Sequence, residues 1–488
     1  MKILLEMRPA LDGHAGIPQE TRLLFRALAG LSEVEVSGLL LTGSRVLAHG
    51  LPVSGGAGRS QDWRINRLSR VVVSLQQSTY PPRLERLRAA MLMARLPLDT
   101  LFGRCQPLTR FEPEHFRDFI WRGLFARTLP REDFDIVTSA PYRVSRVPWS
   151  SMHSMALGTK KLGHALYSRL DTRGFDLMVA ETPFPGRVRA PTKLVVRYHD
   201  AMPMLMPHTI TNRSFHQASH YYALRRNVLD GAWFACVSDA TRRDLISIFP
   251  QAEARAVTIH NMVSPHYRPD DASPHRIPEI LRTRVNADLE TLAAAAPAQP
   301  AVAGTSGTDF LLMVSTLEPR KNHLALLAAW EQLRAEQFPN LQLVFVGALG
   351  WDHEAIVARL RPWVARGALH LLEDVPAPEL RLLYRHARAT VCPSFGEGFD
   401  FSGIEAMRCG GAVAASDITV HHDIFGAACE LFSPYSSAEM AAAIARVIAP
   451  EAQGRRDELV ELGAEVSARY LPERILPQWR EFLDRLAN

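Results

Sequence analysis

Residues 308–470 alternate between short apolar runs and longer stretches in which apolar residues recur at helical spacing. The apolar runs are DFLLMVST, LQLVFVG, LHLLEDV, ATVCPS and AVAAS. Strands that alternate regularly with helices are typical of a parallel sheet covered by helices on both faces. The pattern therefore predicts a Rossmann-like α/β domain. The domain has no G-x-G-x-x-G and the chain has no G-x-x-x-x-G-K-[ST], which disfavours a dinucleotide oxidoreductase and a P-loop NTPase.

The first half of the chain predicts a second domain of the same class. An apolar run at 2–8 is followed by a loop at 12–20 that contains Gly13 and Gly16, and then by a helix to about residue 31. Further apolar runs continue to residue 268, so residues 1–268 are expected to form one Rossmann-like domain. A chain of 488 residues exceeds a single ordinary core, which agrees with two domains.

Two further segments complete the predicted organisation. Residues 269–307 include AAAPAQPAVAGTSGT, a stretch rich in alanine, proline and glycine that predicts an extended interdomain linker. Residues 471–488 include LPERILPQWREFLDRL, whose apolar residues recur at the spacing of an amphipathic helix.

Composition limits where the chain is expected to work. The net charge of +5 and the pI of about 9.0 do not choose among nucleic acid, an anionic membrane and a phosphorylated substrate. The five cysteines include no C-x-x-C pair, as expected in a reducing cytoplasm. No apolar stretch approaches the ~18 residues that span a bilayer, and the first apolar run is too short for a signal peptide. We therefore expect a cytoplasmic protein that is not integral to a membrane.

The stretch at 393–411, PSFGEGFDFSGIEAMRCGG, is the strongest candidate for a ligand site. It follows the apolar run ATVC, passes through a glycine-rich loop and enters a predicted helix at about Ser402. Glu397 lies in the loop and Glu405 in the helix, with seven residues between them. Ligands of open α/β sheets bind at the carboxyl ends of strands, where helix N-termini offer backbone N–H groups to anions. Two carboxylates beside such a site suit a nucleotide sugar, which carries both phosphates and hydroxyls.

This frame, EGF followed by EAM, resembles the signature of the retaining glycosyltransferases of family 4. The segments STLEPRKN (315–322) and VSDATRRDL (237–245) resemble two further segments of that family. The resemblance implies the GT-B fold, in which two Rossmann-like domains face each other across a cleft and the final helix crosses back to the first domain. It covers nearly the whole chain except about 54–131 and the linker.

The resemblance also implies roles for individual residues. Glu405 is expected to bind the ribose hydroxyls, and Arg320 and Lys321 the donor diphosphate. Glu397, with backbone N–H groups near Phe399 to Phe401, is expected to address the sugar. His199 and Asp200, which end an apolar run, are expected beside the sugar, with Gly16 on the acceptor-side loop. The donor-binding residues are thus expected to be Arg320, Lys321, Glu397, Phe399, Asp400, Phe401 and Glu405, and the catalytic residues His199, Asp200 and Glu397.

One departure from the family pattern bears on the donor. Many members have Gly-Leu-Pro after EGF, whereas this chain has Asp400-Phe401-Ser402. The form EGFD-aromatic-SG is similar to that of bacterial polysaccharide mannosyl- and rhamnosyltransferases, which favours a GDP-linked donor. An aspartate there could equally recognise a different hydroxyl pattern or an amino sugar.

The predicted function is retaining transfer of a hexose, mannose or a deoxyhexose, from a nucleoside-diphosphate sugar to a hydroxyl of a glycan or lipid-linked acceptor. The setting would be bacterial surface polysaccharide synthesis, including lipopolysaccharide. The family's usual front-face mechanism needs no cofactor and no metal, and nucleic acid is not an expected partner. Two alternatives remain open: a nucleotide-sugar epimerase of the same fold, and a non-catalytic regulatory protein with a degenerate site.

The segment at about 54–131 departs in composition from the rest of the first domain. Its 14 arginines outnumber its six acids, and LERLRAAMLMARL at 84–96 has helical periodicity. We interpret it as an insertion of amphipathic helices. The insertion is either an ordinary solvated face or a surface that contacts the cytoplasmic face of the inner membrane or a lipid-phosphate acceptor.

Two patterns that suggest a metal have simpler interpretations. Asp133-Phe134-Asp135 has the D-x-D form of metal-dependent glycosyltransferases, but it precedes IVTSA, as Gly174-Phe175-Asp176 precedes LMVAE. Both predict the start of a strand. His421 and His422 have no second pair of ligands at useful spacing and are predicted to be loop residues.

Overall fold

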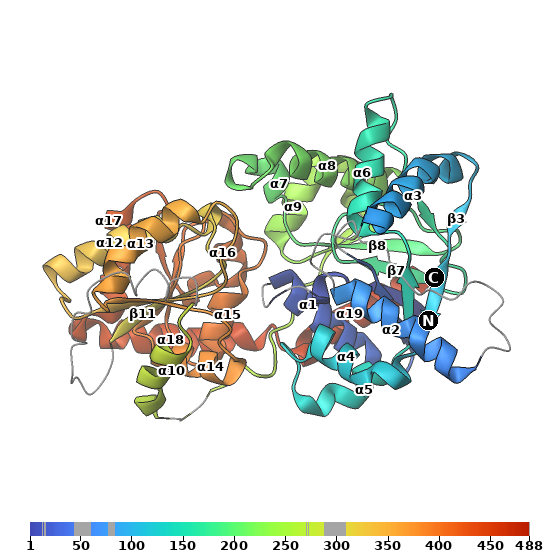
Figure 1. Cartoon of the computed structure of the whole chain (residues 1–488). Coiled ribbons are helices and arrows are strands. Elements are labelled where there is room, and N and C mark those ends of the chain that lie inside the picture. Colours follow the sequence, from blue (N-terminus) through green and yellow to red (C-terminus); the bar gives the residue numbers. More distant parts are fainter. Residues whose placement is uncertain are drawn as a thin grey trace.

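The computed structural model describes residues 1–11, 13, 16–42, 60–76, 83–269, 271, 273–286 and 309–487. These residues form two α/β halves, one built on an eight-stranded sheet and the other on a six-stranded sheet (Figure 1). Among the described residues, no helix is long and apolar enough to cross a membrane.

The first sheet has the strand order β10-β9-β8-β7-β1-β2-β5-β4, and only β4 runs antiparallel to its neighbour. Its strands are buried because helices cover both faces, as parallel sheets require; Ile3, Leu4 and Leu5 of β1 are fully buried. The strands are β1 (Lys2–Glu6), β2 (Glu35–Leu40), β4 (Leu108–Phe111), β5 (Tyr142–Ser145), β7 (Leu177–Ala180), β8 (Lys193–Tyr198), β9 (Trp233–Cys236) and β10 (Ala256–Thr258). A separate pair joins β3 (Cys105–Gln106) to β6 (Arg169–Leu170).

Helices of the first half lie on both sides of this sheet and above its carboxyl edge. They are α1 (Gly16–Ala29), α2 (Gln61–Gln76), α3 (Arg83–Leu101), α4 (Arg117–Ile120), α5 (Phe134–Ser139), α6 (Trp149–Lys160), α7 (Met202–Leu205), α8 (Arg213–Leu229) and α9 (Asp239–Ile248). Ser238 caps α9 by accepting a hydrogen bond from the backbone N–H of Thr241, as its place before that helix predicts.

The second sheet is parallel throughout and has the order β13-β12-β11-β14-β15-β16. Its strands are β11 (Phe310–Val314), β12 (Gln342–Val346), β13 (Leu369–Leu372), β14 (Ala389–Cys392), β15 (Val413–Ser416) and β16 (Glu430–Phe432). Its helices are α12 (His323–Glu336), α13 (Glu354–Ala365), α14 (Ala377–His386), α15 (Phe401–Arg408), α16 (Thr419–Ile424), α17 (Ser437–Ile448) and α18 (Gln453–Ala468). The alternation predicted from the sequence for this half is confirmed.

Both sheets contain a point at which the strand order reverses. The chain leaves β1 in one direction and returns on its other side at β7, and it does the same at β11 and β14. Helices on opposite faces separate at such a point and leave a crevice at the carboxyl ends of the two strands, where α/β proteins bind ligands. The two reversal points fix where each half can hold a ligand.

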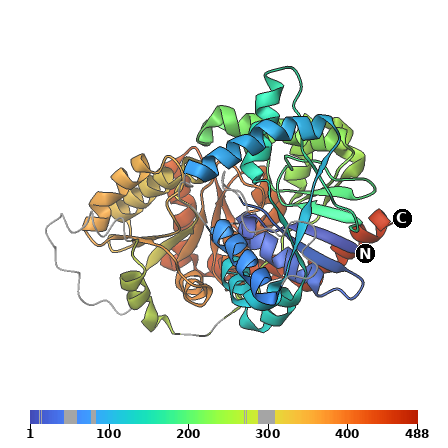
Figure 2. The ribbon, with the colours of Figure 1, turned by 45° about the vertical axis from the view of Figure 1, so that its right-hand side comes forward.

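The last helix, α19 (Pro472–Ala487), returns to the first half. Trp479 is fully buried, and the Arg197 guanidinium lies 5.4 Å from its ring centroid. Lys193 Nζ donates to the carbonyl of Leu486. Both views place the two chain ends close together at the first half (Figures 1 and 2).

Several sequence predictions are wrong in detail. Residues 134–139 form the helix α5 and not a strand, because a short apolar run does not distinguish the two. Residues 277–283, placed in the linker, form α10 (Ile277–Thr283), which packs on α14 of the second half. The insertion at 54–131 is not purely helical, because β4 joins the first sheet. Residues 43–59 and 287–308 lie outside the described part, so the start of the insertion and the rest of the linker remain predictions.

Candidate active site

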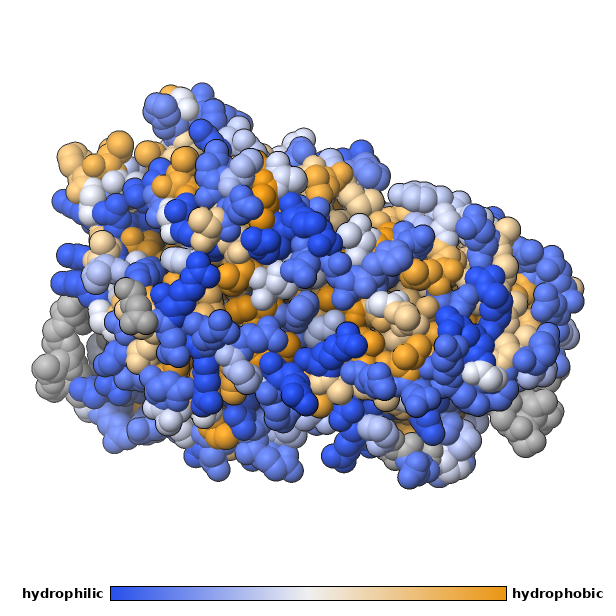
Figure 3. Space-filling view, turned by 180° about the vertical axis from the view of Figure 1, so that it is seen from behind, coloured by the Kyte–Doolittle hydropathy of each residue, from blue (hydrophilic) through white to orange (hydrophobic). Residues whose placement is uncertain are grey.

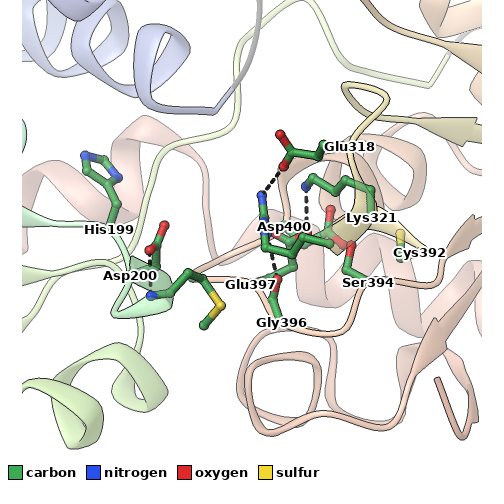
Figure 4. Close-up of polar contacts among 12 residues, drawn as sticks. His199, Asp200, Glu318, Lys321, Cys392, Ser394, Gly396, Glu397 and Asp400 are labelled. Atoms are coloured by element: carbon green, nitrogen blue, oxygen red, sulfur yellow. Dashed lines mark hydrogen bonds and ion pairs between the residues drawn. The ribbon is translucent and has the colours of Figure 1, made fainter. Parts of the chain in front are cut away.

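The reversal point of the second sheet brings together the loop after β11 and the loop after β14. Lys321 Nζ lies 2.6 Å from Oε1 of Glu397, and Arg320 Nη1 lies 2.9 Å from its Oε2. Arg320 Nη1 also donates to the Gly396 carbonyl at 2.6 Å, while its Nη2 contacts Oε1 of Glu318 at 2.9 Å. Two cations and two carboxylates thus form one connected cluster at the strand ends (Figure 4).

Burial and charge set the protonation states in this cluster. Burial alone would raise the pKa of Glu397, but Arg320 and Lys321 outweigh it and lower that pKa. Burial likewise opposes the charge of Arg320, yet Glu397 and Glu318 raise its pKa further above its usual range. Arg320 therefore stays charged, and the side chains of Arg320 and Lys321 keep about 15–16% of their surface exposed. A phosphate-bearing ligand at this edge would meet two fixed positive charges.

His199 and Asp200 follow β8 and lie in the first half, across from the cluster of Lys321 and Glu397 (Figure 4). His199 Nε2 lies 3.4 Å from Oε2 of Glu181, a residue that directly follows β7. Burial lowers the pKa of His199 to about 4 and raises the pKa of Glu181 to about 8. Asp200 accepts a hydrogen bond from the Met202 backbone N–H at 2.9 Å, which holds the start of α7.

The two halves touch at the centre of this region. A Cβ added to Gly398 would lie 1.8 Å from the His199 carbonyl oxygen, so only glycine allows this approach. Thr241 Oγ1 lies 3.4 Å from the carbonyls of both His199 and Gly398. A Cβ on Gly16 would lie 3.3 Å from the Phe401 ring. The residues expected on the two sides of a cleft therefore face one another across a close backbone contact.

Glu405 has a different environment from Glu397. Its Oε1 accepts from Gln19 Nε2 of α1 at 2.8 Å, and its Oε2 accepts from the Tyr384 hydroxyl at 3.0 Å. Burial raises the pKa of Glu405 to about 7, although the hydrogen bonds from Gln19 and Tyr384 act to lower it. Glu405 is thus part of the junction between the halves, and a ribose would have to take the place of Gln19 on its carboxylate.

Asp400 adopts a left-handed backbone conformation at the start of α15, with φ of 62°. Its Oδ1 accepts from the Ser402 hydroxyl at 2.6 Å, and its Oδ2 lies 3.2 Å from His421 Nε2. The other ring nitrogen of His421 lies 2.8 Å from the Ser416 carbonyl. The Asp400 carboxylate is therefore occupied within the loop. His421, predicted as a loop residue, is instead a fully buried residue of α16.

The two aromatic residues of the motif pack within the junction. Phe399 is 3% exposed and lies 5.2 Å from Phe401 and 5.1 Å from Tyr470, measured between ring centroids. Its side chain belongs to the core, so only its backbone is free to meet a ligand.

The patterns that suggested a metal do not form a ligand cluster. Within the described ranges, no three His, Cys, Asp or Glu residues are grouped so that they could hold a metal ion. Asp133 pairs with Arg26 and Asp135 pairs with Arg117, so both carboxylates of the D-x-D are bound by arginines.

Residues 298–465 match the family described as "Glycosyl transferases group 1", and this match includes the Arg320–Lys321–Glu397 cluster and Glu405. The matched residues lie in the second half of the molecule and include its six-stranded sheet.

Two curated relatives are mannosyltransferases of Escherichia coli. The chain is 30% identical to the O-antigen chain mannosyltransferase B over 190 residues. This alignment covers 39% of this chain and 44% of the relative. It is 34% identical to the serotype-specific mannosyltransferase WbdA over 149 residues. This alignment covers 30% of this chain and 18% of the relative. The chain thus spans less than half the length of these relatives.

Solved structures extend the similarity to the whole fold. Sucrose-phosphate synthase from Thermosynechococcus elongatus superposes with a TM-score of 0.58 at 16% identity, covering 100% of this chain and 99% of the other. HepE of Anabaena, solved in complex with UDP-glucose, gives 0.54 at 15% identity, covering 99% of this chain and 100% of the other. Identity this low shows the fold alone. The fold is GT-B, as predicted.

Sequence reasoning missed several residues of this region. Glu318 lies in the family-like segment 315–322 and Gln19 in the first loop, but no role was expected of either, although both contact predicted site residues. Glu181 directly follows a buried strand, and the sequence predicts from this position that it borders the site; it contacts His199 there.

Proposed function

We propose that this protein is a retaining glycosyltransferase that transfers mannose, or a deoxyhexose, from a GDP-sugar to a hydroxyl of a growing bacterial surface polysaccharide. The observation that carries the proposal is the cluster of Arg320, Lys321 and Glu397 at the strand reversal of a group 1 glycosyltransferase domain. The similarity to two E. coli mannosyltransferases supports mannose as the sugar.

The leaving group determines what the cations do. As the bond to the sugar breaks, negative charge develops on the nucleoside diphosphate, and fixed positive charge at that point lowers the barrier. Arg320 and Lys321 hold this charge in a mostly buried site, where its effect is larger than in water. In front-face transfer the leaving phosphate accepts the proton of the acceptor hydroxyl, so no protein nucleophile and no metal are required.

The remaining site residues orient the sugar and the acceptor. Glu397, already held by both cations, presents its carboxylate edge where sugar hydroxyls would lie. His199 lines the other side and is uncharged near neutral pH because burial lowers its pKa to about 4. Asp200 positions the loop that begins α7. Holding both substrates in one orientation supplies much of the rate enhancement in a mechanism of this kind.

We further propose a cytoplasmic enzyme whose glycan or lipid-linked acceptor enters from the first half. Exposed apolar side chains at the end of α3 support contact with the inner-membrane surface: Leu98 is 55% exposed, Leu101 68% and Phe102 76%. Apolar side chains at such a position gain free energy by entering the headgroup region. On the face seen from behind, hydrophobic residues are scattered among hydrophilic ones (Figure 3).

The first test is thermal unfolding with GDP, UDP, dTDP, ADP or CMP, without added metal. A ligand at 100 times its Kd adds about 2.7 kcal/mol to the free energy of unfolding. We expect GDP alone to raise the melting temperature. A response to none of these nucleotides would contradict the nucleotide-sugar site, and a selective response to UDP would keep the transferase and exclude the GDP donor.

Substitution of Glu405 tests the ribose contact. We expect Glu405→Ala to raise the donor KM by about 10- to 100-fold with a smaller change in kcat, because a hydrogen bond to a charged group contributes about 1.5–3 kcal/mol. Gln19→Ala is the control, since it removes the partner of Glu405 without removing the carboxylate. An unaltered donor KM in Glu405→Ala would exclude this role.

A further inference from the structure

A pocket lies at the amino edge of the first sheet, away from the candidate active site at the carboxyl edge. It has a volume of about 280 Å³, and its walls include Lys2, Glu35, Arg110, Arg143, Arg173 and Phe175. Lys2 and Glu35 are the first residues of β1 and β2, and Arg173 and Phe175 precede β7. The strands rise about 3.3 Å per residue, so the length of β1 and β2 separates this pocket from the carboxyl edge.

The pocket has an excess of positive charge. Four of the six wall residues named above are cations and one is a carboxylate. Lys2 lies 3.4 Å from Glu35, and Arg173 is paired with Asp171, which lies outside the wall. For Arg110 and Arg143, the described part of the chain shows no ion pair with a carboxylate within 4.0 Å.

Arg110 and Arg143 also face each other directly. They are opposite partners in the antiparallel pair of β4 and β5, so both side chains point to the same face of the sheet. Like charges placed directly opposite destabilise a sheet. Burial lowers the pKa of Arg143 and the charge of Arg110 lowers it further, and the opposing effect of Glu35 does not outweigh them. An anion between the two guanidinium groups would remove this repulsion.

The chemistry of the walls selects the kind of anion. A guanidinium group presents paired N–H donors that match two oxygens of a phosphate. Phe175 closes one side of the pocket, with the Arg143 guanidinium 5.8 Å from its ring centroid, and this apolar wall lowers the local dielectric and strengthens each charge–charge contact. Two opposed guanidinium groups, with Lys2 and Arg173 beside them, fit a phosphate monoester or diphosphate better than a singly charged carboxylate.

We propose that this pocket binds a phosphoryl group at a site separate from the one that would hold the donor nucleotide. The group would lie between Arg110 and Arg143, with Lys2 and Arg173 at its edges. The proposal does not depend on the proposed transferase function, because it concerns the amino edge of the strands and uses none of the residues of the candidate active site.

Calorimetric titration with pyrophosphate tests the site on the full chain. The candidate active site could also bind pyrophosphate, so the titration is made in wild type, in Lys321→Ala and in Arg110→Gln/Arg143→Gln. We expect pyrophosphate binding to persist in Lys321→Ala. When Arg110→Gln/Arg143→Gln is added to the Lys321→Ala protein, we expect this binding to weaken at least tenfold. Arg359→Gln/Arg361→Gln, on the exposed side of α13, removes the same charge elsewhere and should bind as its parent does.

Two further arms identify the source of the phosphoryl group. Vesicles of phosphatidylcholine with phosphatidic acid offer it as a lipid headgroup, and inorganic phosphate offers it free in solution. Loss of vesicle binding in Arg110→Gln/Arg143→Gln, but not in the control pair, assigns a lipid source, whereas loss of phosphate binding alone assigns a soluble ligand. The proposal is overturned if this variant binds pyrophosphate, phosphate and vesicles as the control pair does. Its melting temperature without ligand should rise, because the repulsion is gone, and this separates lost binding from lost folding.

Discussion

Lys321→Ala should reduce sugar transfer by about 10²- to 10³-fold, the effect of removing one donor at a site of developing charge. Lys321 Nζ lies 2.6 Å from Oε1 of Glu397, and this contact fixes the ammonium group beside the proposed diphosphate site. Without this ammonium group, Arg320 would be the remaining cation of the Arg320–Lys321 pair to face the leaving group. Because this interaction strengthens as the bond breaks, kcat should fall more than donor affinity.

The measurement must separate chemistry from folding. Removing one partner of a buried ion pair often destabilises a protein by about 3–5 kcal/mol, and Glu397 would keep only Arg320 as its cation. Lys321→Arg is therefore made in parallel, since it keeps the charge and the contact with Glu397 while changing the geometry. We expect it to fold as wild type and to recover part of kcat. Unchanged turnover in a folded Lys321→Ala protein would remove Lys321 from the diphosphate site.

The sequence predicted the second sheet well, and it also placed Arg320, Lys321 and Glu397 just after the ends of two of its strands, because both depend on local pattern. Buried parallel strands are continuous apolar runs, and the loops that follow them carry Arg320, Lys321 and Glu397 within a few residues of each strand end. The reversal of strand order at β11 and β14 then brings those loops together. The first step requires no knowledge of a distant contact, whereas the second depends on the pairing of β11 with β14.

The parts that could not be predicted depend on contacts between distant residues. Gln19 and Glu405 are 386 positions apart, and no local pattern indicates that one donates to the other. His421 is buried because Asp400 and the Ser416 carbonyl lie at its two ring nitrogens, which only the folded loop brings together. The helix α5 was mistaken for a strand because its six residues are too few to show a period.

Glu181→Gln should stabilise the protein increasingly as the pH rises from about 5 to about 8. Burial raises the pKa of Glu181 to about 8 in the folded state from an ordinary value of 4.5. Between these values the unfolded chain has released a proton that the native state retains, so the wild-type free energy of unfolding falls as pH rises. Because glutamine does not titrate, the Glu181→Gln protein does not lose this part of the free energy of unfolding. The difference should approach at most about 5 kcal/mol above pH 8, at about 1.36 kcal/mol per pKa unit.

The surroundings of Glu181 explain why its proton is retained. Arg8 lies 3.0 Å from Glu6, and Arg197 lies 2.8 Å from Glu20, so each of these arginines already has its own carboxylate. Glu181 is fully buried, and one of its oxygens, Oε1, has no hydrogen-bond partner. A third negative charge in this space would have no cation of its own, which favours the neutral acid.

Urea unfolding at a series of pH values measures the difference, with Glu336→Gln on the exposed end of α12 as the matched control. The free energy of unfolding of Glu336→Gln should differ little from that of wild type at any pH. If Glu181→Gln instead destabilises the protein at neutral pH, and less as the pH falls below about 5, then Glu181 is a carboxylate in the native state and His199, 3.4 Å away, carries the compensating proton. The direction of the slope therefore decides whether the histidine beside the proposed sugar site is neutral or charged.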